Sequence, residues 1–212
     1  MTERIWDTLR KKYPMSDEQL AQLERYAMLL DQWNTEKSNL TRITAPDDVV
    51  AYHFEDSLAL SRFIDCAQLR GIADVGSGGG FPGLPLKILF PHLFVILIEV
   101  NAKKRAFLES VIADLGLSGI EVCDLDWRTF LRTTAFERID LFTARASLHT
   151  DELLRVFKPG SFYRSAQLVY WGARTWQPEP GDRSALTRTE PYHVGDRDRL
   201  LVFFSAPKKG LS

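Results

Sequence analysis

A glycine-rich string that follows a short apolar segment constrains the fold of this chain more than any other feature. Residues 71–75 are expected to form a buried strand, the string GSGGGFPG follows in residues 76–83, and a helical pattern comes next. This order predicts a nucleotide-binding turn, because glycines allow a tight turn and a helix N-terminus offers unpaired N–H donors. Glu99 ends the next apolar segment, where a carboxylate is placed to accept both hydroxyls of a ribose.

Two cofactor classes fit this turn, and the residues alone leave both open. The dinucleotide pattern Gly-x-Gly-x-x-Gly occurs in residues 78–83, and the pattern Asp-x-Gly-x-Gly-x-Gly of S-adenosylmethionine enzymes occurs in residues 74–80. Pro82 removes an N–H donor that a pyrophosphate would use, and the Asp74 carboxylate would lie close to a dianion. A sulfonium ligand with an α-amino group instead gains from a nearby carboxylate. The turn therefore favours S-adenosyl-L-methionine over NAD.

The pattern along the chain changes near residue 66. Before it the periodicity is helical: Ser16 and Gln19 form a capping box for a first helix through residue 33, and Pro46 begins a second. After it strands and helices alternate, with Asn101 capping a helix over residues 102–115. We expect an α/β fold with a mostly parallel sheet, comprising a helical extension (1–66) packed on a cofactor-binding domain (67–212). The expected strands are 71–75, 93–98, 120–123, 139–144, 167–171 and 200–204, with a further helix over 148–157; residues 174–198 have no assignable pattern.

Charge and cysteine content bound the partners and the compartment. The net charge is −1, from 27 Lys and Arg against 28 Asp and Glu, which would argue against a nucleic-acid partner. The charge is uneven, however: −4 over residues 1–66, −1 over 67–142 and +4 over 143–212. Two cysteines are too few for a disulfide framework or a Cys-rich metal site. With no long apolar run and no apolar core near Met1, we expect a cytoplasmic monomer without a membrane or metal partner.

Several segments together resemble one family, the bacterial small-subunit ribosomal RNA guanine-N7 methyltransferases, also called glucose-inhibited division protein B. The glycine turn alone is moderately specific, but its combination with HFEDS and with ARA is highly specific. The resembling segments lie in the family's order over nearly the whole chain: WN (33–34), NLT (39–41), HFEDS (53–57), DVGSGGGFPGLPLKI (74–88), residues 90–108, TARA (143–146) and RLLV (199–202).

The resemblance implies a class I, Rossmann-like methyltransferase that methylates guanine N7 in 16S ribosomal RNA, with that RNA or the small ribosomal subunit as its partner. The turn and the resemblance together give the expected cofactor-binding residues Asp74, Gly76, Gly78, Gly80, Phe81, Glu99, Trp127, Arg128 and Arg145. The expected substrate-binding residues are Asn39, His53, Asp56 and Arg145. Without the resemblance, Asn39 is a turn residue, and His53 and Asp56 are a polar pair on one helix face.

The chemistry needs no general base, because N7 of guanine has an exposed lone pair and bears no proton. Catalysis then reduces to orientation and the exclusion of water, so no proton-transfer residue is expected. Residues 103–105 (KKR) are expected to be a solvated run of charge.

Two departures from the family leave rival functions open. Asp126-Trp127-Arg128 stands where the family has Arg-x-Glu, and Trp171-Gly172 stands where it has Lys-Gly or Lys-Ala. A divergent, weakly active or inactive member would persist as an RNA- or ribosome-binding module. The dinucleotide pattern leaves an NAD-dependent oxidoreductase as the third hypothesis.

Overall fold

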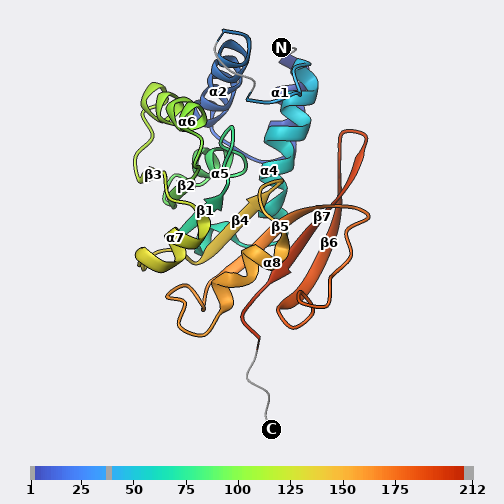
Figure 1. The fold of residues 1–212 in the computed structure, drawn as a ribbon. Helices are drawn as coiled ribbons and strands as arrows, with labels where there is room; N and C mark the ends of the chain where they lie inside the picture. The colour runs from blue at the N-terminus through green and yellow to red at the C-terminus, as the bar shows by residue number, and fades with distance from the viewer. Residues whose placement is uncertain (1–2, 37–39, 208–212) are drawn as a thin grey trace.

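A single mixed sheet forms the centre of the molecule (Figure 1). The computed structural model describes residues 3–36 and 40–207, and within them seven strands run in the order β3-β2-β1-β4-β5-β7-β6. Strands β1 to β5 are parallel, whereas β7 pairs antiparallel with both β5 and β6. The predicted mostly parallel α/β fold is therefore confirmed. The strands are β1 (Gly71–Val75), β2 (Phe94–Ile98), β3 (Ile120–Cys123), β4 (Leu141–Arg145), β5 (Gln167–Ala173), β6 (Leu186–Val194) and β7 (Arg197–Phe204).

Two of the longer helices begin where a side chain provides a partner for their first N–H groups. The Ser16 and Gln19 capping box is reciprocal, with N···O distances of 2.9 and 3.1 Å, and Asn101 accepts from the amides of Lys103 and Lys104. The helical elements are α1 (Glu3–Lys12), α2 (Asp17–Glu36), α3 (Pro46–Val49), the π-helical η1 (Val50–Glu55), α4 (Asp56–Leu58), the 3₁₀ turns η2 (Ala59–Arg62) and η3 (Cys66–Gln68), α5 (Gly83–Leu89), α6 (Ala102–Asp114), α7 (Trp127–Thr133), α8 (Thr150–Leu153) and the 3₁₀ turn η4 (Leu154–Phe157).

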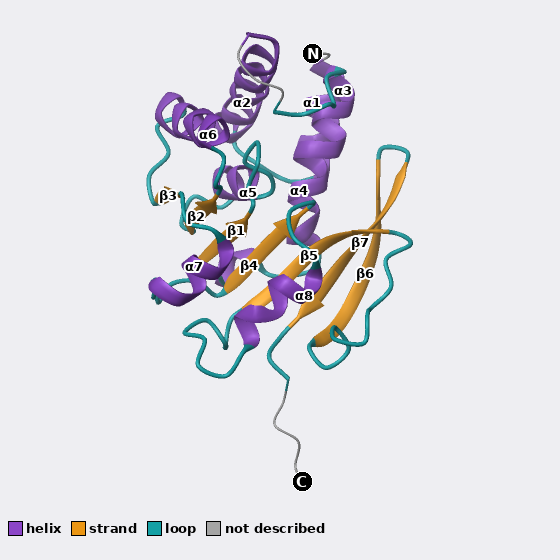
Figure 2. Ribbon diagram, viewed as in Figure 1, coloured by secondary structure: helices purple, strands orange, loops and turns teal. Residues whose placement is uncertain are grey.

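Alternate residues of the central strands face two separate apolar cores. In β2, Val95 and Leu97 join one core, while Ile96 and Ile98 join the other. Because successive side chains of a strand point to opposite faces, continuous apolar runs such as residues 94–98 bury both faces. Helices α1, α2, α5 and α6 cover the first face, and α7, α8 and η4 cover the second (Figure 2).

The N-terminal helices share their core with the sheet. Trp6, Leu23 and Phe54 belong to the same buried cluster as Ile72 of β1 and Leu141 of β4. The predicted domain boundary at residue 66 stays a prediction. None of the helices within residues 3–36 and 40–207 has the length and apolar character needed to span a bilayer.

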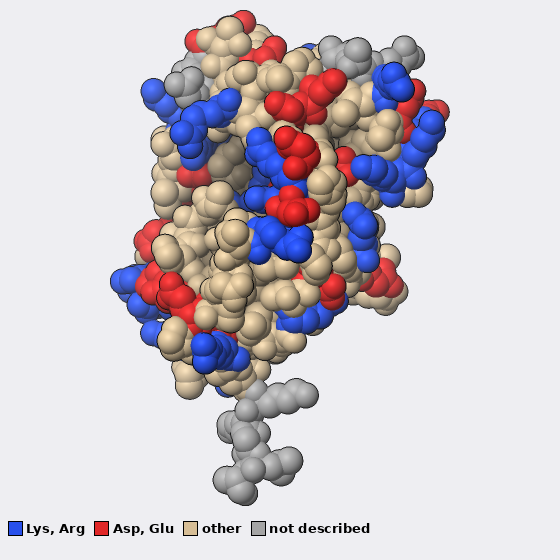
Figure 3. Space-filling view, turned by 90° about the vertical axis from the view of Figure 1, so that its right-hand side faces the viewer, with Lys and Arg blue, Asp and Glu red and all other residues tan. Residues whose placement is uncertain are grey.

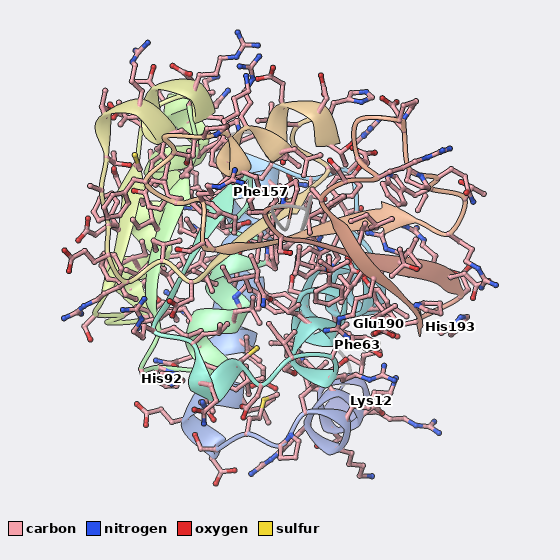
Figure 4. The ribbon with its side chains drawn as sticks, turned by 90° about the horizontal axis from the view of Figure 1, so that it is seen from below. Lys12, Phe63, His92, Phe157, Glu190 and His193 are labelled. Carbon is pink, nitrogen blue, oxygen red and sulfur yellow. The ribbon has the colours of Figure 1, made fainter. Side chains whose placement is uncertain are left out.

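The segment without an assignable pattern contains most of a hairpin at the sheet edge. Strand β6 lies at this edge, and its polar residues alternate with the buried Tyr192 and Val194. Figure 4 shows Glu190 of β6 beside Phe63, whose carbonyl accepts from Arg188 Nη2 at 2.9 Å. The turn between β6 and β7 lies against η1, where the Tyr52 hydroxyl donates to Asp196 Oδ1.

Candidate active site

The glycine turn is anchored by backbone hydrogen bonds and passes close to the end of β4. The amides of Gly76 and Ser77 both donate to the carbonyl of Ile98, at 2.8 and 3.0 Å. Gly76 has a φ of +68°, and a Cβ there would lie 2.6 Å from Cβ of Ser147. Gly78 has a φ of +60°, and a Cβ there would meet only the Gly76 carbonyl, at 3.9 Å. The backbone at Gly78 is therefore bare towards the cavity that it lines.

Asp74 acts behind the turn and does not line the cavities that flank it. Its carboxylate has no exposed surface and accepts from the amide of Gly83 at 3.0 Å and from Thr143 Oγ1 at 2.9 Å. Burial raises its pKa to about 6. The sequence places Asp74 beside a ligand amino group, whereas the structure places it at the first turn of α5. There it occupies an N–H donor and opposes the approach of a pyrophosphate dianion, which weakens the dinucleotide alternative.

Gly80 likewise faces the interior. A Cβ at this position would lie 2.4 Å from Cδ1 of Leu84 and 2.6 Å from the Tyr26 hydroxyl. Its φ of +93° is needed for the turn to enter α5. Gly80 is thus absent from the cavity linings, unlike Gly76, Gly78 and Phe81.

A cavity of about 330 Å³ opens between the ends of β1, β2 and β4, and we call it the Glu99 cavity. Glu99 is 6% exposed, and its two oxygens accept from the amides of Gly78 and Asn101 at 2.9 and 2.8 Å. Because each carboxylate oxygen has two lone pairs, Glu99 retains acceptor capacity towards the cavity. The lining residues are Val75, Gly76, Ile98, Glu99, Val100, Lys104, Leu125, Asp126, Trp127, Ala146, Ser147 and Leu148.

The Asp126-Trp127-Arg128 segment uses its charges for local structure. Asp126 caps α7 by accepting from the amides of Arg128 and Thr129, and Arg128 forms a bidentate pair with Glu152 at 2.8 and 2.6 Å. Trp127 lines the Glu99 cavity and donates its indole N–H to the Glu152 carbonyl at 2.8 Å. Of the two residues predicted here, the structure brings Trp127 to the cavity and Arg128 to the outer surface.

A second cavity, of about 280 Å³, lies between the glycine turn and the N-terminal helices, and we call it the His53 cavity. It shares Gly76, Lys104 and Ala146 with the Glu99 cavity, so the two are neighbours along the carboxyl edge of the sheet. Figure 3 shows Lys and Arg side chains gathered beside a hollow on one face of the molecule. The lining residues are Leu30, Leu40, Thr41, Ile43, Tyr52, His53, Asp56, Gly76–Gly79, Phe81, Lys104, Arg145, Ala146, Arg197 and Arg199.

Arg145, at the end of β4, joins the sheet to η1 and α4. Its Nη1 donates to Asp56 Oδ2 and to the Tyr52 carbonyl, both at 3.0 Å, and its Nη2 lies 3.3 Å from Nδ1 of His53. The guanidinium carbon also lies 5.2 Å from the centre of the Phe81 ring. The structure therefore brings together His53 and Asp56 from one segment, Phe81 from the glycine turn and Arg145 from the end of β4.

His53 is neutral in this setting. Burial first, and then the charge of Arg145, lower its pKa to about 3. A guanidinium only donates, so we assign Nδ1 as the acceptor and Nε2–H as the donor to Thr41 Oγ1 at 2.8 Å. The ring also stacks on Phe81, with centroids 4.7 Å apart.

Asp56 is saturated by its own protein. It is 3% exposed, and besides Arg145 it accepts from the Tyr192 hydroxyl at 2.6 Å and from Arg199 at 3.2 and 3.3 Å. The backbone carbonyl of Asp56 accepts from Nε1 of Trp171 at 2.9 Å. Trp171, which occupies the position of the family's lysine, is therefore packed in the core. The carboxylate lines the cavity, but its lone pairs are committed to holding β7, β6 and β4 together.

Several cavity residues escaped the sequence reasoning. Lys104 was expected in a solvated run, yet it lines both cavities, because the first turn of α6 follows directly after Glu99. Thr41 lay in a resembling segment without an assigned role. Arg199 likewise lay in the resembling segment 199–202 without an assigned role, and Tyr52, Arg197 and Ser147 had no local signal. Asn39, a predicted substrate residue, lies outside the described residues.

The described part of the chain contains no group of three or more His, Cys, Asp or Glu side chains arranged to hold a metal ion. Ser147 Oγ, which borders the Glu99 cavity, is buried and has no hydrogen-bond partner within residues 3–36 and 40–207. A buried hydroxyl without a partner calls for an explanation, and a water or a ligand group in the adjoining Glu99 cavity is one.

Comparisons with known proteins agree on one family. A family model described as rRNA small subunit methyltransferase G (GidB) matches residues 19–175. A ribosomal RNA small subunit methyltransferase G from Geobacillus sp. (strain WCH70) is 44% identical over 137 residues, which form 64% of this chain and 57% of the relative. That from Desulfitobacterium hafniense (strain Y51) is 36% identical over 183 residues, 84% of this chain and 73% of the relative. The chain thus spans little more than half the length of the Geobacillus relative.

The fold is also that of known methyltransferase structures. The human methyltransferase 10 domain containing protein superposes with a TM-score of 0.60 at 14% identity, covering 86% of this chain and 96% of that one. A likeness at this identity concerns the fold alone, and it confirms the expected class I, Rossmann-like architecture.

Proposed function

The chain belongs to the rRNA small subunit methyltransferase G (GidB) family, and we propose that it transfers a methyl group from S-adenosylmethionine to N7 of a guanine in small-subunit (16S) ribosomal RNA. The observation that carries the proposal is a pair of adjoining cavities, one beside Glu99 and one beside His53, that share Gly76, Lys104 and Ala146. We further propose that the chain acts as a cytoplasmic monomer.

The residues of the Glu99 cavity fit S-adenosylmethionine. Glu99 would accept the ribose hydroxyls, Trp127 and Val100 would flank the adenine, and the unpartnered Ser147 Oγ offers one further hydrogen bond. Gly78 leaves room for the methionyl part against the turn, and Gly76 lines both cavities. Asp74 and Gly80 support the turn from behind, whereas Arg128 pairs with Glu152 on the outer surface. When bound, S-adenosylmethionine supplies an electrophilic methyl group on a positively charged sulfur.

The His53 cavity suits a base that needs no proton removed. His53 uses both ring nitrogens in hydrogen bonds, and Asp56 accepts bonds at both oxygens, so neither group is free to act as a general base. Guanine N7 requires none. The role we assign to His53, Asp56 and Arg145 is therefore to fix the shape of the base-binding cavity and exclude water. Asn39 stays a predicted substrate contact.

A methyl-transfer assay tests the proposal. The full chain is incubated with methyl-labelled S-adenosylmethionine and, separately, with transcribed 16S rRNA, purified small subunits and intact ribosomes. Digestion to nucleosides should yield labelled 7-methylguanosine from at least one of them. Titration calorimetry measures cofactor binding independently.

Other outcomes distinguish the rival functions. Binding of S-adenosylmethionine and RNA without methyl transfer would favour the non-catalytic RNA-binding module. Binding of NAD in place of S-adenosylmethionine would favour the oxidoreductase.

A further inference from the structure

The β6–β7 turn brings one exposed arginine to the mouth of the His53 cavity. Arg197 is the first residue of β7, lines this cavity, and its side chain is 53% exposed. The turn reaches the cavity because it docks on Tyr52 of η1: the Tyr52 hydroxyl donates to Asp196 Oδ1, and a Cβ at Gly195 would lie 2.8 Å from the Tyr52 ring. Tyr52 and the turn therefore fix where Arg197 stands.

The three cavity arginines differ in how far they are neutralised. Arg145 and Arg199 share the single buried carboxylate of Asp56. Arg197 has one carboxylate nearby, with Nε 3.9 Å from Asp196 Oδ1. Within the described residues, no hydrogen bond of its guanidinium is found. The positive charge of Arg197 is therefore only weakly neutralised by the protein. Its guanidinium N–H groups are available to donate to a ligand.

The stacking of Arg197 explains how it is held without using those donors. Its guanidinium carbon lies 3.7 Å from the centre of the Tyr52 ring. Cation–π stacking uses the face of the guanidinium plane and leaves the N–H groups, which lie in the plane, free at its edge. An edge of this kind matches the oxygens of a phosphate, which accept two parallel hydrogen bonds.

We propose that Arg197, held by Tyr52 and Asp196, binds a phosphate of the RNA strand at the mouth of the His53 cavity, next to the nucleotide that enters it. The inference rests on the proposed function, because it takes the RNA as the occupant of this cavity. It assigns a binding role to a turn that the sequence left without a pattern. Phosphate contacts set the register of a nucleic acid on a protein, so Arg197 would position the target nucleotide without touching its base.

Salt-titrated RNA binding tests the inference. The probes are transcribed 16S rRNA and purified small subunits, each measured over a range of salt concentrations, with S-adenosylmethionine affinity measured by calorimetry on the same samples. We expect Arg197→Gln to weaken RNA binding by about 10-fold at low salt and to reduce the slope of log K against log salt by about 1. Cofactor affinity should not change.

Two further variants separate placement from charge. Tyr52→Ala removes the stacking surface but leaves Arg197 in the chain, so most of the same loss should appear if placement matters. Arg132→Gln, an equal change of charge at an exposed position of α7 that lines neither cavity, should leave affinity and salt slope at wild-type values. Circular dichroism of each variant checks that it is folded.

The outcomes keep the two proposals apart. If the wild-type chain binds cofactor and methylates RNA while Arg197→Gln matches it in affinity and slope, this inference is overturned and the proposed function stands. If Arg197→Gln and Arg132→Gln lose RNA affinity equally, the effect is general charge and the inference is again overturned. A wild-type chain that binds neither S-adenosylmethionine nor RNA overturns the proposed function, and the inference with it.

Discussion

The two cavities are built in different ways. The Glu99 cavity is formed by turns that lie within a few residues of the strands they follow, and backbone groups hold its main side chain in place. The His53 cavity is held by one buried carboxylate, Asp56, whose partners lie 89 to 143 residues further along the chain. The first depends on local conformation, and the second depends on electrostatics between distant elements.

This difference teaches where each cavity is sensitive. A site shaped by backbone conformation fails when a side chain is added, whereas a site held by a buried ion network fails when a charge is removed. The predictions below follow this contrast.

Removing the Asp56 carboxylate should have the largest effect. Asp56→Ala leaves Arg145 and Arg199 without a counter-ion in a buried position, so we expect a loss of about 3–5 kcal/mol in the free energy of unfolding, measured by urea titration. Asp56→Asn, which keeps a hydrogen-bond acceptor, should lose less. The control is Asp114→Ala, which breaks the exposed Arg25–Asp114 pair and should cost at most about 1 kcal/mol. Equal losses in Asp56→Ala and the control would contradict the proposed contrast.

Adding a methyl group at Gly76 should act mainly on the cofactor. The new Cβ would lie 2.6 Å from Ser147 Cβ at a φ of +68°, so Gly76→Ala must displace the junction of the two cavities. Overpacking of this kind costs about 1–3 kcal/mol. If the protein relieves the clash by moving Ser147 and the turn, the cofactor must restore them at a similar cost, which corresponds to about a 5- to 150-fold loss of S-adenosylmethionine affinity by calorimetry.

Gly116→Ala is the matched control for Gly76→Ala. Gly116 has a φ of +62° but nothing within 4 Å of an added Cβ. It should share the backbone strain without the loss of affinity. A similar loss of affinity in both variants would show that strain, and not the contact with Ser147, is responsible.

Protonation of His53 should give a pH dependence specific to the His53 cavity. Because burial lowers its pKa from 6.5 to about 3, the unfolded chain binds this proton more tightly than the folded one. The contribution of His53 to the free energy of unfolding is therefore complete above pH 6.5. It is lost as the pH falls from 6.5 towards 3, at up to about 1.4 kcal/mol per pH unit.

The Asp74 carboxyl changes the free energy of unfolding with pH in the opposite direction to His53. The measurement on His53 must therefore remove the Asp74 contribution. The raised Asp74 pKa of about 6 makes the folded state bind the proton more tightly, so it adds stability as pH falls from 6 to about 3.8. The unfolding free energy of wild type minus that of His53→Gln cancels the Asp74 contribution. If that difference does not fall between pH 6.5 and 4, the neutral state of His53 is wrong.

The smallest effect should come from a substitution in the Asp126-Trp127-Arg128 segment, which departs from the family pattern beside the Glu99 cavity. Arg128 is exposed and paired with Glu152 on the surface, so Arg128→Ala should leave the unfolding free energy close to that of wild type. Its S-adenosylmethionine affinity should stay within about twofold of wild type, because the side chain lies outside the cavity. A clear loss of S-adenosylmethionine affinity in Arg128→Ala would show that Arg128 contributes to cofactor binding.

Much of the fold was predictable because its signals are local. Ser16 with Gln19 and Asn101 cap their helices as predicted, and the strand over residues 120–123 has the predicted bounds. Strands buried on both faces are continuous apolar runs, which a sequence displays directly. Strand β6 was missed because it has one face in solvent and its residues are mostly polar.

The residues of the candidate site also fall into two groups, those with a local signal in the sequence and those without one. Glycines that need a positive φ and an acid that follows a strand leave marks in the sequence, so Gly76, Gly78 and Glu99 were identified and lie at the cavity. Whether a predicted residue faces a cavity or the interior depends on neighbours far along the chain. In the structure, Asp74 and Gly80 therefore face the interior and Arg128 faces the outer surface. Lys104 lines both cavities.

By itself, the sequence determined the strand–turn–helix unit, the parallel sheet and the resemblance to one family, because each is indicated by patterns within short segments of the chain. The tertiary structure decided that Asp56 binds both Arg145 and Arg199, that His53 is neutral, and that an edge hairpin brings Arg197 to the cavity mouth. Burial and charge pairing set these properties, and both arise only when distant segments meet in a medium that excludes water.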